Sequence, residues 1–526
     1  MDRERDAREQ RKERDLPGMR RRRRYLARPV LLASFACLAL MLSSCKMGPD
    51  YTRPEPPKGD SWRMTAATAE SIANLPWWEL LKDQELQKLV RAAILENLDL
   101  RIAAANIEEF RAQLVIAKFD LAPSLSYSGN AFGLRNTNSD VIPIGGLGVP
   151  AGGKSDGLTL GYEGVSAGLK WEADLWGRLR RSIEAAQAQL LSQEEHQRAV
   201  ILGLVSNVAE AYFDLRGLDY EAEVARRTLR AWEETVRLSE LRYRHGDVSK
   251  LDLDRFEAER AGTAAQLADL ERQVVQTENR LSILLGRKPE VVSRGLGLND
   301  QPMPPAVPPG LPSDLLQRRP DILEVEQKLA EATANIGIAQ ANRFPQLALT
   351  GSAGGGGFQL SGASAGPFAV FSGSASLSGP LLNATALGYQ VRVTEAKAEA
   401  ALAQYKKTVL TAFKEVEDAL IAVQKAGEQR TAQEQQVAAL QSAFRFSDLR
   451  YQGGRASYLD VLTAQRSLFE AELGLARTRR TQLKSVVQLY KALGGGWAPD
   501  GSTDRRLVSS PVAPGVGQPD PAAITR

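Results

Sequence analysis

Few residues in this sequence are arranged to do chemistry. Gly148 to Ser155 match the phosphate-binding P-loop pattern, which needs a preceding strand and a following helix N-terminus to hold phosphate. A strand-like segment follows instead, so we expect Lys154 to lie in a loop between two strands. Gly354 to Gly357 are likewise expected to form a loop, not a dinucleotide-binding fingerprint. The two histidines, His196 and His245, are too few for a metal cluster or a Ser-His-Asp triad. The residues predict no enzyme, no cofactor and no metal site.

Two similar segments, 243–252 and 451–460, combine tyrosine, glycine, serine and an acidic residue. A glycine in the left-handed conformation commonly ends a helix. A serine followed three residues later by a carboxylate forms a capping box that starts the next helix. The glycines and capping pairs are Gly246, Ser249 and Asp252 in the first segment, and Gly454, Ser457 and Asp460 in the second. Each segment therefore predicts a sharp turn between two helices.

Cys45 is the third candidate, and it follows a signal-like segment, residues 1–44. The basic run Arg20 to Arg24 precedes an apolar run of 13 residues, Val30 to Leu42, which is too short to span a bilayer. The small residues just before Cys45 resemble a bacterial lipobox, in which the chain is cut before the cysteine and the cysteine is lipidated. An ordinary cleavable signal and a twin-arginine signal are the alternatives. Met19 is a possible true start.

The composition excludes several classes of protein. The net charge of +4 arises in the signal, because residues 1–44 contain 12 of the 67 bases and 6 of the 63 acids. A near-neutral mature chain argues against nucleic-acid binding. Cys37 lies in the signal, so the mature chain has no disulfide. No stretch of about 18 apolar residues occurs, so a chain that crosses a membrane must do so as a β-barrel.

The sequence is internally duplicated, which is the feature that organises the turns. Ser239 to Tyr243 recur as Ser447 to Tyr451, and both capping pairs recur at the same offset. Upstream, Asp99 and Pro123 recur as Asp321 and Pro345. We expect two halves, 84–286 and 313–497, after a lipidated N-terminal segment, 45–83. A Pro-rich connector, 287–312, joins the halves, and 498–526 form a flexible tail.

Each half has the same expected order of elements. A helix comes first, then a pair of strands with period-two alternation, a very long helix of ~100 Å, the turn, and a shorter helix. In the first half these are helix 84–120, strand pair 124–172, helix 178–243 and helix 250–285. In the second half they are helix 313–342, strand pair 346–381, helix 386–451 and helix 458–493. The fold class is thus mainly α with β, with four strands per chain.

Four strands cannot close a barrel, and open strand edges are not tolerated in lipid. Three copies would supply twelve strands, enough to close around a lumen. The long helices have charged faces and must extend into an aqueous compartment. We therefore expect a homotrimer with a 12-stranded β-barrel that continues into a long α-helical barrel.

Several motifs resemble the TolC-like outer membrane factors, in particular the lipoprotein branch that serves resistance-nodulation-division (RND) efflux pumps. The resemblance covers about residues 45–497, and its motifs are 174–177 (Asp-Leu-Trp-Gly), 318–322 (Arg-Arg-Pro-Asp-Ile), 344–345 (Phe-Pro) and 490–497. It implies an outer-membrane channel that extends into the periplasm and exports small molecules passively. It also implies two partners, a periplasmic adaptor (membrane fusion) protein and an inner-membrane RND pump.

The resemblance further implies that the turns form a periplasmic tip gate. Tyr451 and Asp460 match gate positions of the family, and we add their repeat counterparts Tyr243 and Asp252. Repeated acids around a threefold axis would favour cations. The sequence departs from the family at Thr463, where a second Asp is common. Arg242 and Arg450 are either ion-pairing locks of the tip or solvated helix ends.

Other functions stay open at this point. A type I protein-secretion duct shares the fold and is the first alternative. A periplasmic coiled-coil structural lipoprotein and the adaptor itself are others, although the strand pairs argue against both. Drugs, metal ions and aromatic compounds all remain possible cargo.

Overall fold

The computed structural model describes most of the chain between residues 46 and 495. The described residues are 46–55, 62, 82–136, 141–144, 147–150, 158–303, 315–360 and 363–495. Cys45 and the expected tail lie outside them. The chain divides into two compact units. Unit 1 consists of Met1–Thr52, Phe110–Gln189 and Leu329–Ala401, and unit 2 of Arg53–Glu109, Leu190–Lys328 and Leu402–Arg526.

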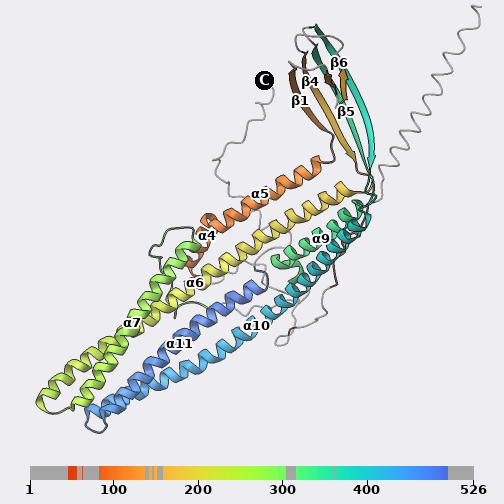
Figure 1. The fold of residues 1–526 in the computed structure, drawn as a ribbon. Coiled ribbons are helices and arrows are strands. Elements are labelled where there is room, and N and C mark those ends of the chain that lie inside the picture. The colour runs from red at the N-terminus through yellow and green to blue at the C-terminus, as the bar shows by residue number, and fades with distance from the viewer. Residues whose placement is uncertain are drawn as a thin grey trace, which may run out of the picture. The chain divides into compact units, whose positions relative to one another are not determined.

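Unit 1 contains a four-stranded antiparallel sheet with the order β1-β4-β5-β6 (Figure 1). Its strands are β1 (Ser124–Asn136), β4 (Leu158–Ala173), β5 (Gln346–Leu360) and β6 (Ala363–Ser378). The central pair, β4 and β5, joins the two sequence repeats along their whole length. Each repeat thus contributes one half of the sheet, β1 and β4 from the first and β5 and β6 from the second, as the duplicated strand pairs predict.

The two faces of this sheet differ in polarity, as expected for alternating strands. One face carries hydroxyl side chains that bond across strands: Ser128 to Ser166 at 3.0 Å and Ser352 to Ser372 at 2.7 Å. The other face carries apolar side chains that are exposed in the single chain. These are Leu125, Tyr127, Val165, Leu169, Phe371 and Leu377. We call the first the serine face and the second the apolar face.

Two sequence-based expectations for the strand zones are wrong. The zone 124–172 contains an additional hairpin, β2 (Val141–Ile144) with β3 (Leu147–Pro150), and the intervening Gly-Gly is a two-residue hairpin signal. Gly354 to Gly357 lie inside β5 and pair with β4, so they are not a loop. A Cβ at Gly354 or Gly356 would meet the β4 backbone at under 3 Å, so glycine permits the close strand approach. The P-loop-like segment begins in β3 and is followed by β4.

Two of the family-like motifs meet within unit 1, and the start of the described chain packs on one of them through a 3.1 Å hydrogen bond from the Met47 amide to the Trp176 carbonyl. The Trp176 indole donates a hydrogen bond of 2.7 Å to the Pro345 carbonyl and stacks on Phe344 at 4.7 Å. Gly48 lies against Gly337, where an added Cβ would come within 2.5 Å of the Gly337 Cα. The two motifs therefore join the junction of β4 with α6 (Arg178–His245) to the junction of α9 (Pro320–Ala341) with β5, and the segment 46–52 packs on α9 beside them.

The helices in chain order are α4 (Gln84–Glu96), α5 (Leu98–Phe119), α6 (Arg178–His245), α7 (Lys250–Leu284), α8 (Leu315–Arg318), α9 (Pro320–Ala341), α10 (Ala384–Gln452) and α11 (Tyr458–Ala492). In unit 2, α7 returns beside α6 and α11 beside α10 (Figure 1). Within the described residues, no helix is both long enough and apolar enough to cross a membrane.

The first helix of each half is broken, which corrects the single helices expected at 84–120 and 313–342. Asn97 is buried between α4 and α5, where its amide donates to the Leu284 carbonyl (2.9 Å) and accepts from the Leu100 amide (3.1 Å). Asn97 thus caps α5 and ties the break to α7. Between α8 and α9, Pro320 disfavours helical geometry at the preceding Arg319.

The main core of unit 2 joins the repeats. Buried side chains of α6 and α11 meet there with those of α4 and α7, including Val208, Phe213, Leu281, Leu483 and Tyr490. Asp83, which is 1% exposed, caps α4 and accepts 2.8 Å and 2.7 Å hydrogen bonds from Tyr212 and Gln301. This buried network ties the connector to α4 and α6.

Arg319 joins three helices of the second repeat in unit 2. It is buried and donates to the Asp321 and Glu415 carboxylates (2.6 and 2.7 Å) and to the Ala492 carbonyl (2.9 Å). These hydrogen bonds raise the pKa of Arg319, against the opposing effect of its burial. The Arg-Arg-Pro-Asp motif therefore links the start of α9 to α10 and to the end of α11.

Candidate channel gate

The two turns of unit 2 have the same backbone geometry. After α6, the amides of Gly246 and Asp247 donate to the carbonyls of Tyr243 and Arg242 (3.0 and 2.9 Å), and after α10 the corresponding amides of Gly454 and Arg455 do the same. This pattern is a Schellman ending, and the two glycines have the left-handed φ values of +85° and +69° that it needs. The turns predicted at both sites are present.

Both following helices begin with the expected serine caps. The Ser249 hydroxyl accepts a 3.1 Å hydrogen bond from the Asp252 amide and donates to the Asp252 carboxylate at 2.7 Å. The Ser457 amide and hydroxyl both donate to the Asp460 carboxylate at 3.1 Å. The carboxylates lie in the first turns of their helices, where the N-terminal dipole stabilises negative charge.

The turns of the two repeats are joined by Arg242 and Tyr451. The Arg242 guanidinium donates a 2.7 Å hydrogen bond to the Tyr451 hydroxyl, and its central carbon lies 5.7 Å from the Tyr451 ring centre. This contact combines a charge-assisted hydrogen bond with a cation–π attraction. Arg242 therefore bonds to a hydroxyl and not to a carboxylate, unlike the ion-pair lock considered from the sequence.

An aromatic cluster packs against the Tyr451 ring of this contact. Tyr458 meets Tyr451 edge-on at 4.7 Å and Phe256 at 4.3 Å, and Phe256 belongs to a small core with Trp232. Burial raises the pKa of Tyr458, so this ring stays neutral. Sequence reasoning missed Tyr458 and Phe256, although Tyr458 stands where the first repeat has Lys250, a departure from the repeat that could have marked it.

The two turn acids differ in their electrostatic surroundings. Asp252 has the Arg255 guanidinium 3.5 Å away. At the position equivalent to Arg255, the second repeat has Thr463, and no cation in the described part of the chain pairs with Asp460. Asp460 is also exposed, so its negative charge is the less compensated of the two. The structure therefore makes Asp460 the stronger candidate for attracting cations.

Tyr243 and Arg450 are also predicted at the turns, and their surroundings differ from those of their repeat counterparts. Tyr243 is 43% exposed, whereas its counterpart Tyr451 is half-buried against Arg242. Arg450 donates a long hydrogen bond, 3.4 Å, to the Arg455 carbonyl. The repeat is thus symmetric in backbone and asymmetric in side-chain contacts. Among the described residues, no group of three His, Cys, Asp or Glu side chains could hold a metal ion.

Sequence comparison gives matches over almost the whole described chain. The model of the family described as outer membrane efflux protein matches residues 89–287 and 311–495. The chain is 35% identical over 477 residues to the toluene efflux pump outer membrane protein TtgC of Pseudomonas putida, covering 89% of this chain and 96% of TtgC. It is 30% identical over 472 residues to the cation efflux system protein CusC of Escherichia coli O6:H1, covering 88% and 98%.

Solved structures give the same picture. The open state of the Neisseria gonorrhoeae MtrE outer membrane channel matches with a TM-score of 0.74 and 32% identity, covering 86% of this chain and 98% of MtrE. A membrane protein from Pseudomonas aeruginosa matches with a TM-score of 0.76 and 31% identity, covering 88% and 100%.

Proposed function

The chain belongs to the outer membrane efflux protein family, and from this premise we propose a homotrimeric export channel that is gated at the turns 243–252 and 451–460. The TolC-like resemblance is confirmed, and with it the predicted place in the outer membrane and role in efflux. The oligomer, the partners, the lipid anchor and the gate are proposals that go further.

The difference between the two faces of the sheet is the main observation that supports a channel. One face bears hydroxyls and the other bears exposed leucine, valine and aromatic side chains. A sheet with these faces suits water on one side and lipid on the other. Its outer strands, β1 and β6, have unpaired edges within the described sheet, which lipid does not tolerate. Pairing β6 of one copy with β1 of the next closes a barrel of three copies.

The Arg242–Tyr451 contact supports a gate at the turns. It fixes the end of the α6–α7 hairpin to the end of the α10–α11 hairpin, so opening one pair of hairpins must break it. In a trimer, this contact would occur three times around the axis. Asp460, which pairs with no cation in the part of the chain that the structure describes, would give the aperture its preference for cations.

Cys45 would anchor the mature chain to the outer membrane through lipid. The residue after it is Lys46, and the segment that follows is held by the Arg181 guanidinium, which donates to the Met47 and Gly48 carbonyls at 2.9 Å. A lipid at Cys45 would therefore lie a residue or two from a fixed point of unit 1. The partners proposed are a periplasmic adaptor and an inner-membrane RND pump.

A passive role would leave cargo selection to the pump. TtgC is named for toluene and CusC for cations, and this chain is 35% identical to the first and 30% to the second. A purely coiled-coil lipoprotein does not fit the four-stranded sheet. No observation favours protein secretion over small-molecule efflux.

Planar-bilayer recording of the purified chain tests the channel. We expect single channels of one conductance, a trimer in electron micrographs, and loss of both after Gly355→Pro, which would break β4–β5 pairing. The matched control is Gly388→Ala in α10, where an added Cβ meets no atom. A closed barrel in a monomer, or no conductance from a folded trimer, would contradict the proposal.

A further inference from the structure

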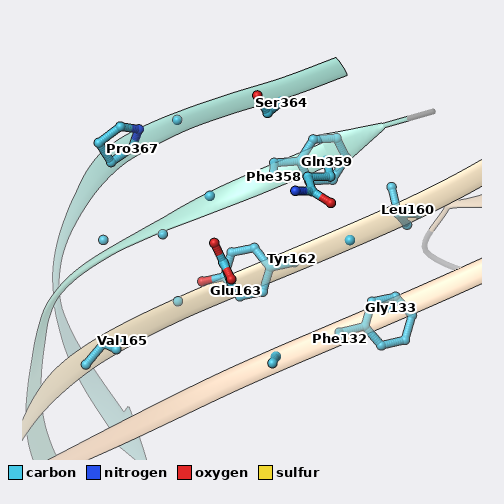
Figure 2. A pocket seen from close by; sticks show the side chains of 17 residues that line it. Phe132, Gly133, Leu160, Tyr162, Glu163, Val165, Phe358, Gln359, Ser364 and Pro367 are labelled. Carbon is cyan, nitrogen blue, oxygen red and sulfur yellow. The ribbon is translucent and has the colours of Figure 1, made fainter. Parts of the chain in front are cut away.

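Four aromatic side chains lie together at the end of the sheet that is remote from the helices. Phe132 on β1 is in register with Tyr162 on β4, and Tyr162 with Phe358 on β5. Phe368 on β6 is in register with Gly356, two residues from Phe358. Figure 2 shows the first three on adjacent strands.

All four belong to the serine face. Residues an even number apart on one strand share a face. Phe132 is four residues from Ser128, Tyr162 is four from Ser166, and Phe368 is four from Ser372. Since these serines bond across the serine face, the aromatic rings stand on that face too. Phe358 is six residues from Ser352 on β5, so it lies on the same face.

The aromatic rings of the serine face are less exposed than the aromatic rings of the apolar face. Tyr162, Phe368 and Phe132 are 39%, 40% and 54% exposed, whereas Tyr127 and Phe371 on the apolar face are 90% and 78% exposed. A Cβ at Gly164 would meet the Tyr162 hydroxyl at 2.4 Å, so the tyrosine ring folds over this glycine. Phe132, Tyr162 and Phe358 line, with their neighbours, a hollow of about 950 Å³ (Figure 2). Phe368 lies next to Pro367, which also lines it.

The opposite face changes character at the same level. Nearer the helices, the apolar face carries Val165 and Leu169. At the level of the aromatic rings, it carries Glu163 and Gln359 instead. A carboxylate and an amide mark the boundary of the lipid-facing band. The aromatic row thus lies at the outer mouth, where a polar, serine-lined wall becomes aromatic.

We propose that Phe132, Tyr162, Phe358 and Phe368 form an aromatic collar inside the outer mouth that binds aromatic molecules, including aromatic organic cations, as they leave. This rests on the proposed function, because the serine face lines a lumen only if three copies close a barrel. Stacking and cation–π attraction supply the affinity, and each copy supplies four rings. The collar would briefly retain aromatic cargo and pass hydrophilic ions.

The test uses tetraphenylphosphonium, added to the loop side of trimers in a planar bilayer. The parent should show brief current blockades. The triple variant Phe132→Ser, Phe358→Ser, Phe368→Ser continues the serine wall and should shorten the blockades at least tenfold. The control, Ser166→Ala with Ser352→Ala, changes the same face where no ring stands and should keep the parent's blockades. Phe132→Ser alone, expected to shorten them severalfold, serves if the triple variant does not assemble.

A second variant tests the position of the rings. Gly164→Ala would push the Tyr162 ring off the wall into the lumen and should lower single-channel conductance. The control Gly168→Ala lies on the same face and meets only the Ser126 hydroxyl, at 3.3 Å. Unchanged blockades in the aromatic variants, in trimers that still respond to changes at the turns, would overturn the collar alone. A parent chain that forms no channel would overturn the proposed function and the collar with it.

Discussion

Arg242 of the first repeat donates a 2.7 Å hydrogen bond to the Tyr451 hydroxyl of the second. The acceptor is a phenol hydroxyl, and no carboxylate among the described residues pairs with Arg242, so the contact brings a positive charge to the junction of the two hairpins. Breaking the hydrogen bond and the cation–π contact would cost about 2 kcal/mol and would return the guanidinium to water. Such a contact can hold a closed tip and still yield to a partner.

Removing this contact should open the resting channel. Tyr451→Phe deletes the hydrogen bond and keeps the ring, and Arg242→Ala deletes both the hydrogen bond and the cation–π attraction, a loss of about 2 kcal/mol. Bilayer recordings should show a higher open probability, larger for Arg242→Ala. The matched control is Tyr243→Phe, the exposed repeat counterpart. Equal open probability in all four proteins would remove Arg242 and Tyr451 from the gate.

Replacing Asp460 should reduce cation preference. Asp460→Asn removes a carboxylate that pairs with no cation in the described ranges, so the reversal potential in a salt gradient should move toward zero. Asp252→Asn should have a smaller effect because Arg255 already lies at 3.5 Å. Thr463→Arg, which copies the first repeat, should act like Asp460→Asn. If the reversal potential is the same in every variant, the acids are helix caps only.

Arg319 should stabilise the helical unit. Arg319→Met removes hydrogen bonds to Asp321, Glu415 and Ala492. Because the two carboxylates are partly exposed, we expect a loss of about 2 kcal/mol rather than that of a fully buried pair. The midpoint of thermal unfolding should fall. Arg318→Met, next to it and without a described partner, is the control, and equal midpoints would contradict the clamp.

Stability should fall at high pH partly because of Tyr212. Burial and the hydrogen bond to Asp83 raise the pKa of Tyr212 above its ordinary value of 10.0. The folded chain therefore keeps a proton that the unfolded chain loses, so this contribution is complete below pH 10 and declines as the pH rises further. Tyr212→Phe should lower stability near neutral pH by about 1 kcal/mol. It should also make the decline above pH 10 shallower than in the control Tyr127→Phe, when urea unfolding is followed against pH.

Cys45 should be the lipidated first residue of the mature chain. Mass spectrometry of protein purified from membranes should find acyl chains on Cys45 and no peptide that contains Cys37. Cys45→Ser should leave the channel able to conduct but reduce its retention in outer-membrane fractions. An unmodified chain that still includes the signal would disprove the anchor.

The sequence by itself determined the features that depend on neighbours along the chain. The duplicated turns, their glycines and their serine caps follow from hydrogen bonds that span about five residues, so Gly246 and Ser457 could be placed without a structure. The same holds for the alternating strands, whose period follows from the backbone alone. The long helices could be predicted because no proline interrupts them.

The tertiary structure decided what depends on distant segments. The helix break at Asn97 exists because the Leu284 carbonyl lies within reach of its amide, and Gly354 to Gly357 form a strand because β4 lies alongside. The repeat predicts the same surroundings for Tyr243 and Tyr451, yet Arg242 bonds to Tyr451, whereas its counterpart Arg450 bonds to the Arg455 carbonyl. An internal repeat copies the local backbone, but each copy packs against different neighbours, and those neighbours fix what its side chains can do.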